Sequence, residues 1–188
     1  MTATSSTTTG LPTGLTVGTW VVETSHSAAT FTVRHAGIAK VRGSVAITEG
    51  AITVGEDLAS TTVTATLDPA TIDTRDSGRD THLRSGDFFE VETYPTWTFT
   101  STSIWADGDD YVIAGHLTMH GVTKPIELRT EFNGAATDPF GAERVGFTAA
   151  TEVSRKDFGL TWNAALETGG VLVSDTVKIT LDVEAVKA

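Results

Sequence analysis

Histidines are the side chains of this sequence best suited to metal or acid–base chemistry, and the chain has five of them. His116 and His120 are four residues apart in a strand-like stretch, so both would point to one face and could bind a metal together with His35 or His82. A tetrahedral site needs at least three converging ligands, and nothing in the spacing supplies the third. The sequence therefore predicts no metal site.

Nucleophilic catalysis has little support in the sequence. His26 and Ser27, with an acidic residue elsewhere, complete the inventory of a Ser-His-Asp triad, but no G-x-S-x-G elbow surrounds the serine. The chain has no cysteine, which removes thiolate nucleophiles, disulfides and iron–sulfur ligands. One enzymatic alternative stays open, in which the protein acts on a small hydrophobic substrate with His35 or His82 as its acid or base.

Charged side chains are concentrated in the segment between Asp68 and Pro95. Guanidinium groups there could clamp an anionic head group, because they bind carboxylate and phosphate through two parallel hydrogen bonds. Pairing along a helix surface is the stronger interpretation, since residues four apart are neighbours on a helix. The charged cluster consists of Arg75, Asp76, Arg79, Asp80, His82 and Arg84.

Aromatic side chains give a better lead to a binding site. They lie in different strand-like stretches, and several alternate with threonine, so their rings should converge on one interior. A filled core is the commoner explanation for any single ring, but a barrel of about eight strands either packs solid or holds one apolar ligand. The rings concerned are Phe31, Phe88, Phe89, Trp97, Phe99, Phe147, Phe158 and Trp162.

The elements that must position these side chains are strands. Threonine accounts for 35 of the 188 residues, and apolar residues alternate with polar ones through most of the chain, which is typical of half-buried strands. About eight or nine strands with short connections indicate an antiparallel sandwich or a closed barrel. The predicted strands are 19–23, 30–35, 41–54, 61–67, 96–100, 111–119, 125–133, 145–153 and 176–186, with turn signals at 49–50, 107–109, 120–121, 133–134 and 169–170.

The segment from Asp68 to Pro95 breaks the strand pattern. It is too long for a hairpin turn, and long excursions in a compact domain are usually lids or covering helices. We expect one or two short helical turns in it, around Ser77–Arg84 and Gly86–Phe89. Phe88 and Phe89 should then be buried against the open end or the flank of the sheet.

The N-terminal 17 residues carry no ionisable side chain and are rich in Thr, Ser and Gly. They lack the basic start and the continuous apolar stretch of a secretory signal, which predicts a flexible tail over 1–17, a single domain over 18–188 and a cytoplasmic location. The net charge of −11 argues against duplex nucleic acid and anionic membranes as partners. Membrane contact is expected to be transient at most.

The motifs, taken in order, resemble the YceI-like family of bacterial polyisoprenoid-binding proteins. The similarity runs from about Gly18 to the C-terminus. Glu23 and Val45 stand where the family pattern would have Asp and an aromatic residue. The matching stretches are WVVETSHS from Trp20, then Phe31, Val33, His35, Gly43 and Thr74, RDTHLRS from Arg79, DFF from Asp87, YP from Tyr94, GHLTMHGVTKP from Gly115 and RKDFG from Arg155.

The resemblance implies an all-β, lipocalin-like antiparallel β-barrel of about eight strands that binds a lipid without catalysis. The expected ligand is a long-chain isoprenoid, such as a polyprenyl or quinone tail, or a related amphiphilic lipid that the protein transports or stores, with a link to stress responses. No cofactor is required, and a homodimer would suit a barrel with exposed edges. A barrel packed solid, which acts through its surface as an interaction module, is a further alternative.

The resemblance and the alternation together place the ligand contacts. The residues expected to bind the chain are Phe31, Val33, His35, Phe88, Phe89, Trp97, Phe99, Leu117, Phe147, Phe158 and Trp162. The candidates for the polar head group are Arg79, His82, Arg84 and Arg155.

Overall fold

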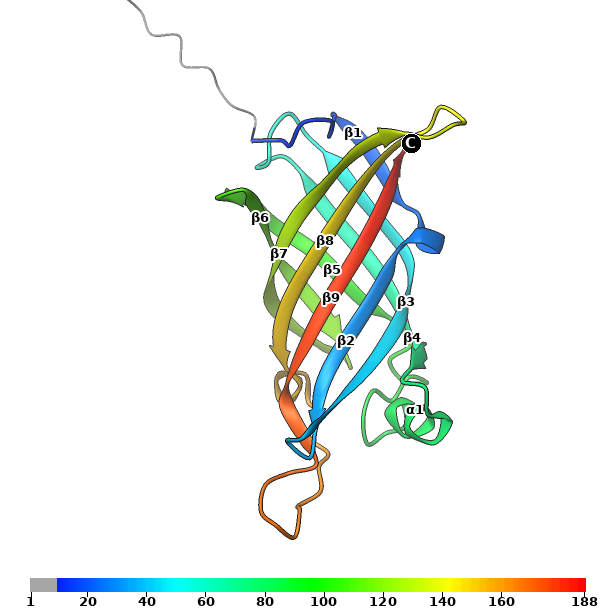
Figure 1. Ribbon diagram of the computed structural model, residues 1–188, viewed down its shortest axis with the longest axis vertical. Coiled ribbons are helices and arrows are strands. Elements are labelled where there is room, and N and C mark those ends of the chain that lie inside the picture. Colours follow the sequence, from blue (N-terminus) through cyan, green and yellow to red (C-terminus); the bar gives the residue numbers. More distant parts are fainter. Residues whose placement is uncertain (1–9) are drawn as a thin grey trace, which may run out of the picture.

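The computed structural model describes residues 10–188, which form an elongated barrel of antiparallel strands (Figure 1). One α-helix and two short 3-10 helices accompany the strands: α1 (Ser77–Arg84), η1 (Thr24–His26) and η2 (Arg155–Phe158). The strands are β1 (Gly18–Val22), β2 (Ala28–His35), β3 (Ala39–Val54), β4 (Thr62–Asp73), β5 (Trp97–Asp107), β6 (Asp110–Met119), β7 (Val122–Thr137), β8 (Glu143–Ser154) and β9 (Val173–Lys187).

The barrel is closed, because every strand pairs with a neighbour on each side. The strands β1 and β2 together occupy one position in the wall, between β3 and β9. In β1, Val21 pairs with Ala51 of β3 and with Val186 of β9. In β2, Ala29 pairs with Val45 of β3 and with Leu181 of β9. The interruption between the two strands is η1. The nine strands therefore make an eight-stranded closed barrel, which confirms the predicted fold class.

Alternation along the strands separates an apolar interior from a threonine-rich exterior. On β5, Trp97 and Phe99 are buried, whereas Thr98 and Thr100 between and beyond them are exposed. Threonine suits the exposed positions because its branched Cβ favours the extended backbone while its hydroxyl stays in water. The abundance of threonine thus reflects the outer face of the barrel.

Two inward-facing glycines make room for aromatic rings. Gly43 of β3 is the direct cross-strand partner of Phe31, and a Cβ on this glycine would collide with the phenyl ring. Gly115 of β6 pairs with Ser101 on β5, and a Cβ on it would collide with the ring of Phe99. Each ring therefore lies over a neighbouring backbone instead of filling the centre of the barrel.

Several predicted boundaries need correction. The turn signals at 49–50 and 133–134 lie inside β3 and β7, where the register shifts by β-bulges. The chain does turn at 107–109 and 120–121. The strand predicted to end at Leu67 continues as β4 to Asp73, because the irregularity in its pairing with β3 accommodates Pro69. The excursion accordingly begins at Thr74 instead of Asp68.

The excursion covers one flank of the barrel at the lower end in Figure 1. Its helix, α1, occupies the predicted residues, and the carboxylate of Asp76 caps it by accepting the backbone N–H of Arg79 at 2.8 Å. Residues 86–89 form hydrogen-bonded turns instead of a second helix. Phe88 is buried, as predicted, and Phe89 is half-buried against Trp97.

The other end of the barrel is crossed by the chain before β1. Of the tail predicted over 1–17, residues 1–9 lie outside the described part of the chain. Residues 10–17 pack on the barrel, and Leu15 is only 7% exposed in a cluster with Trp20 and Ile52. The indole N–H of Trp20 donates to the carbonyl of Thr16 at 2.9 Å, which fastens this segment to the first strand.

Candidate functional site

The interior of the barrel contains a cavity of about 270 Å³. This volume lies near the lower end of the roughly 300–1,000 Å³ typical of small-molecule sites. The described residues that line the cavity are uncharged except for Arg155. Apolar contributions from around the wall include Phe31, Val45, Phe99, Leu117, Phe147 and Ile179.

The cavity extends along the barrel from one end to the other. Its lining begins with Leu15 and Leu58 beside the N-terminal segment and reaches Leu83 of α1 and Phe88 of the excursion. An apolar space of this shape matches an extended hydrocarbon chain. The cavity also shows that the interior is not packed solid, whereas the interaction-module alternative requires a solid interior.

Most of the predicted contact residues line this cavity, and three do not. Phe158 is 1% exposed and belongs to the packed core around η2. Trp162 lies in the β8–β9 loop and packs on Phe88, with ring centroids 5.3 Å apart. His35 is exposed at the end of β2. The predicted residues that line the cavity are Phe31, Val33, Phe88, Phe89, Trp97, Phe99, Leu117, Phe147 and Arg155.

Residue-type reasoning favoured aromatic rings and missed the small and aliphatic part of the lining. Val45, Ala149 and Val177 face the cavity, and the period-two alternation of their strands could have placed them there. Trp97 carries a further feature that sequence could not reveal. Its indole N–H is buried and has no hydrogen-bond acceptor among the described residues.

The polar residues proposed for a head group mostly hold the excursion in place. Arg79 donates from Nε to the hydroxyl of Thr74 at 2.7 Å and from Nη2 to the Thr74 carbonyl at 2.8 Å. Buried Asp80 accepts from the same hydroxyl at 2.6 Å. Arg84 reaches the carbonyl of Ile72 at 3.5 Å. The cluster thus makes structural contacts, but these are hydrogen bonds to Thr74 and Ile72, and the predicted pairing along the helix surface is not seen among the described residues.

Neither histidine of the enzymatic alternative lines the cavity. The Nε2 atom of His82 lies 2.8 Å from a carboxylate oxygen of Asp87, and its ring packs edge-on against Phe88 and Trp162. His35 is exposed on the rim. Neither His35 nor His82 is therefore placed to act as acid or base on a ligand inside the barrel.

Arg155 is buried at the α1 end of the cavity, with 4% of its surface exposed. Its guanidinium donates to the carbonyls of Leu160 at 2.6 Å, Trp162 at 2.9 Å and Ser174 at 3.0 Å. Burial lowers the pKa of this guanidinium, and Asp175 at 3.7 Å acts in the opposite direction. These contacts tie the start of the β8–β9 loop to the start of β9.

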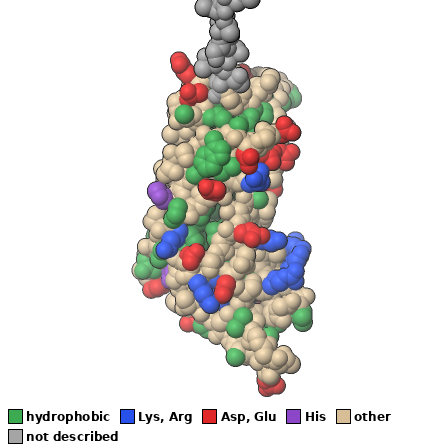
Figure 2. Space-filling view, turned by 90° about the vertical axis from the view of Figure 1, so that its left-hand side faces the viewer, with side chains coloured by type: hydrophobic (Ala, Val, Ile, Leu, Met, Phe, Trp, Pro, Cys, Tyr) green, Lys and Arg blue, Asp and Glu red, His purple; other side chains and the backbone are tan. Residues whose placement is uncertain are grey.

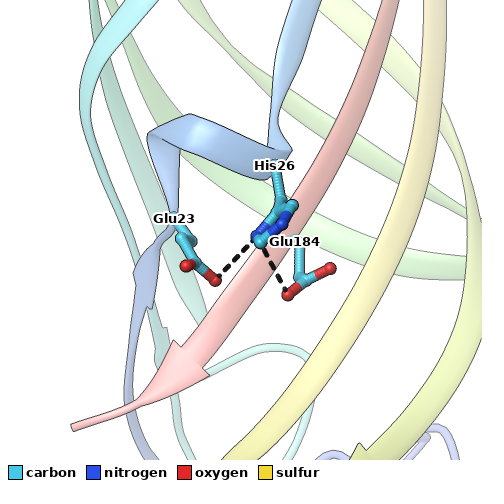
Figure 3. A group of neighbouring side chains, drawn as sticks. All are labelled: Glu23, His26 and Glu184. Carbon is cyan, nitrogen blue, oxygen red and sulfur yellow. Dashed lines mark ion pairs between the residues drawn. The ribbon is translucent and has the colours of Figure 1, made fainter.

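A second polar cluster lies on the outside of the barrel where β1 gives way to β2 (Figure 3). The Nδ1 atom of His26 is 3.2 Å from a carboxylate oxygen of Glu23 and 3.7 Å from one of Glu184. These ligand atoms are close enough for a metal ion. Arg144 already supplies the positive charge, because it donates to Glu23, to Glu184 at 2.5 Å and to Asp138 at 2.8 Å.

The cluster works as a clasp around the interrupted strand. Arg144 lies on β8, Glu184 on β9, and Glu23 immediately precedes η1. The backbone N–H of Glu23 also donates to the carbonyl of Glu184 at 2.8 Å. Hydrogen bonds from His26 and then Arg144 lower the pKa of Glu23 from its ordinary 4.5, and those from Arg144 and the N–H of Ala142 lower the pKa of Asp138 from 3.8.

Replacing Arg144 with glutamine is expected to lower the melting temperature at pH 7. Groups with depressed pKa values stabilise the fold above their ordinary pKa, and this contribution disappears as the pH falls through the lowered pKa. The difference in melting temperature between the two proteins should therefore shrink as the pH falls below about 4. Thermal unfolding followed by circular dichroism tests this. Arg129→Gln, which removes an exposed pair with Asp107, is the control. A difference that does not depend on pH would contradict the clasp.

The described part of the chain contains no helix that is both long and apolar enough to span a membrane.

A closed antiparallel barrel around an apolar cavity defines the class of lipocalin-like barrels. The chain belongs to the YceI family: the YceI-like domain matches residues 20–185. The chain is 40% identical to protein YceI of a strain of Escherichia coli over 139 residues, which are 73% of each protein.

The fold of this chain is shared by solved structures of other proteins. BcnA of Burkholderia cenocepacia superposes with a TM-score of 0.72 at 20% identity, covering 87% of this chain and 98% of BcnA. A polyisoprenoid binding domain from Saccharophagus degradans, implicated in plant cell wall breakdown, gives a TM-score of 0.66 at 17% identity, covering 92% of this chain and all of that domain.

Proposed function

We propose that the protein binds the hydrocarbon chain of an isoprenoid lipid inside the barrel, and that it transports or stores this lipid without chemical change. The observation that carries the proposal is the apolar cavity that runs between the two ends of the barrel. The polyisoprenoid binding of the Saccharophagus degradans domain, which has the same fold, supports the choice of lipid class.

The energetics of such a cavity suit a carrier. Burying one methylene contributes about 0.8 kcal/mol, so about ten buried carbons supply roughly 8 kcal/mol, the free energy of a micromolar complex. Apolar contacts of this kind discriminate weakly between chains that differ by a single carbon. The protein should therefore accept prenols and quinones of several lengths, with the polar head group at an end of the barrel.

Native mass spectrometry of the purified protein tests the proposal. We expect a bound mass that organic extraction removes, and we expect the stripped protein to take up one polyprenol or long-chain quinone per barrel. The indole of Trp97 lies in the cavity wall, so its fluorescence should change on uptake. A stripped, folded protein that takes up neither a prenol nor a quinone would overturn the proposed function.

A further inference from the structure

The hairpin formed by β2 and β3 differs in charge from the rest of the molecule. The chain as a whole carries a net charge of −11. No Asp or Glu occurs from Ala28 to Thr48, whereas Arg34, Lys40 and Arg42 all lie in this stretch and are exposed. The hairpin is therefore a basic region on the surface of an acidic protein.

The three cations of the hairpin have no anionic partner in the part of the chain that the structure describes. Arg34 and Lys40 are direct cross-strand partners, and like charges in this arrangement repel. None of the three makes an ion pair within residues 10–188. On the adjoining β9, Lys178 is already paired with Glu152 at 3.6 Å. An external anion would relieve the repulsion that the fold leaves in place.

A different wall of the barrel shows the contrast. Figure 2 presents the side at the left of Figure 1, where Lys and Arg side chains lie beside Asp and Glu. On β7, for example, Arg129 pairs with Asp107 at 2.8 Å and approaches Asp110 at 3.9 Å. Arg129 is therefore neutralised within the protein, and the other cation of β7, Lys124, has no like charge as its cross-strand partner.

Apolar side chains project from the same end of the barrel as the basic hairpin. Ile38, in the turn between β2 and β3, is 87% exposed, and Val171 of the β8–β9 loop is 50% exposed. The two loops are joined, because the backbone N–H of Ala36 donates to the carbonyl of Leu172 at 2.7 Å. Bare aliphatic side chains at a basic tip are typical of proteins that insert shallowly into a lipid surface.

The tip adjoins one end of the cavity. Val33, next to Arg34, and Val173, next to Leu172, both line the cavity. The turn between β2 and β3, the β8–β9 loop and α1 all lie at the lower end in Figure 1. A lipid that leaves a bilayer under this tip would meet apolar side chains at once.

We propose that this tip, made of Arg34, Ile38, Lys40, Arg42 and Val171, docks on an anionic phospholipid bilayer. Each cation that reaches an anionic leaflet strengthens binding roughly fivefold. Glu167 is an exposed acidic residue in the same loop as Val171, and it opposes docking locally. The acidic residues of the barrel wall are screened beyond about 10 Å, and their repulsion orients the barrel end-on. The purpose of docking, to exchange lipid, rests on the proposed function, whereas the docking itself does not.

Co-sedimentation with vesicles tests the docking. Phosphatidylcholine vesicles that contain phosphatidylglycerol should bind the protein, more weakly as salt is added, and pure phosphatidylcholine vesicles should bind it at least about tenfold less. The double variant Arg34→Gln/Lys40→Gln should lose at least about tenfold in affinity. The control Lys124→Gln/Arg129→Gln removes two exposed cations from β7 and should change binding less than about twofold.

A second pair of variants, one test and one control, examines the apolar part of the tip. Ile38→Ser should weaken binding to anionic vesicles, whereas Phe140→Ser, which removes a 95% exposed ring in the β7–β8 loop, should not. Equal effects of either pair of variants, or equal binding to both kinds of vesicle, would overturn the inference. Prenol uptake by the same variants in the absence of vesicles separates the two proposals. If the protein takes up prenol but does not bind vesicles, only the docking proposal is refuted. If it binds vesicles but takes up no prenol, only the proposed lipid-binding function is refuted.

Discussion

Replacing Ala149 with phenylalanine is expected to remove most of the affinity for lipid while the barrel stays folded. Ala149 is 6% exposed, faces the cavity from β8 and pairs with Thr130 of β7 and Leu181 of β9. A phenyl ring at this position occupies space that about four methylenes of a ligand would fill. The loss should be roughly 3 kcal/mol, on the order of 100-fold in Kd.

The neighbouring residue supplies a matched control. Ala150 follows Ala149 on β8 but is exposed, because successive side chains of a strand point to opposite faces. Ala150→Phe makes the same chemical change on the outside of the barrel and should leave prenol binding unaltered. Both affinities can be measured by titration of the stripped proteins, with thermal unfolding to show that each variant is folded. Equal affinities for the two variants would mean that the cavity is not the binding site.

The fold could be predicted from local signals because a barrel repeats one of them. Trp97 and Phe99 alternate with exposed threonines, and Asp107 pairs with Asp110 across a tight turn that the sequence announces. The helix over Ser77–Arg84 was also predictable, since an Asp precedes it and its charged residues are spaced for a helix. Each of these signals lies within a few residues of the structure that it specifies.

The features that escaped prediction depend on long-range pairing. The strands β1 and β2 share one position in the barrel wall because both pair with β3 and β9. No local sequence pattern contains the register of this pairing. The clasp joins Glu23 to Arg144 across 121 positions of the chain. Arg155 looked like one of several basic residues near an opening, because sequence does not show which carbonyl oxygens the fold brings around a guanidinium.

Replacing Arg155 with methionine is therefore expected to destabilise the protein strongly. The guanidinium is buried, and its loss leaves the carbonyls of Leu160, Trp162 and Ser174 without the donors that they have in the folded protein. Removing a buried charged partner of this kind costs about 3–5 kcal/mol. In a chain of this length the melting temperature should fall by roughly 10 °C.

Two comparisons give this prediction its meaning. Lys156→Met removes the adjacent cation, which is exposed and paired with Asp175 at 3.1 Å, and should change the free energy of unfolding by less than about 0.5 kcal/mol. Arg155→Lys keeps the charge but loses the planar fork, so its stability should lie between that of the wild type and that of the methionine variant. If Arg155 serves a lipid head group instead, the methionine variant will unfold like Lys156→Met and lose affinity for quinones and prenols. A large loss of stability assigns the residue to the barrel itself, because the carbonyls that surround the guanidinium then have no other source of hydrogen bonds.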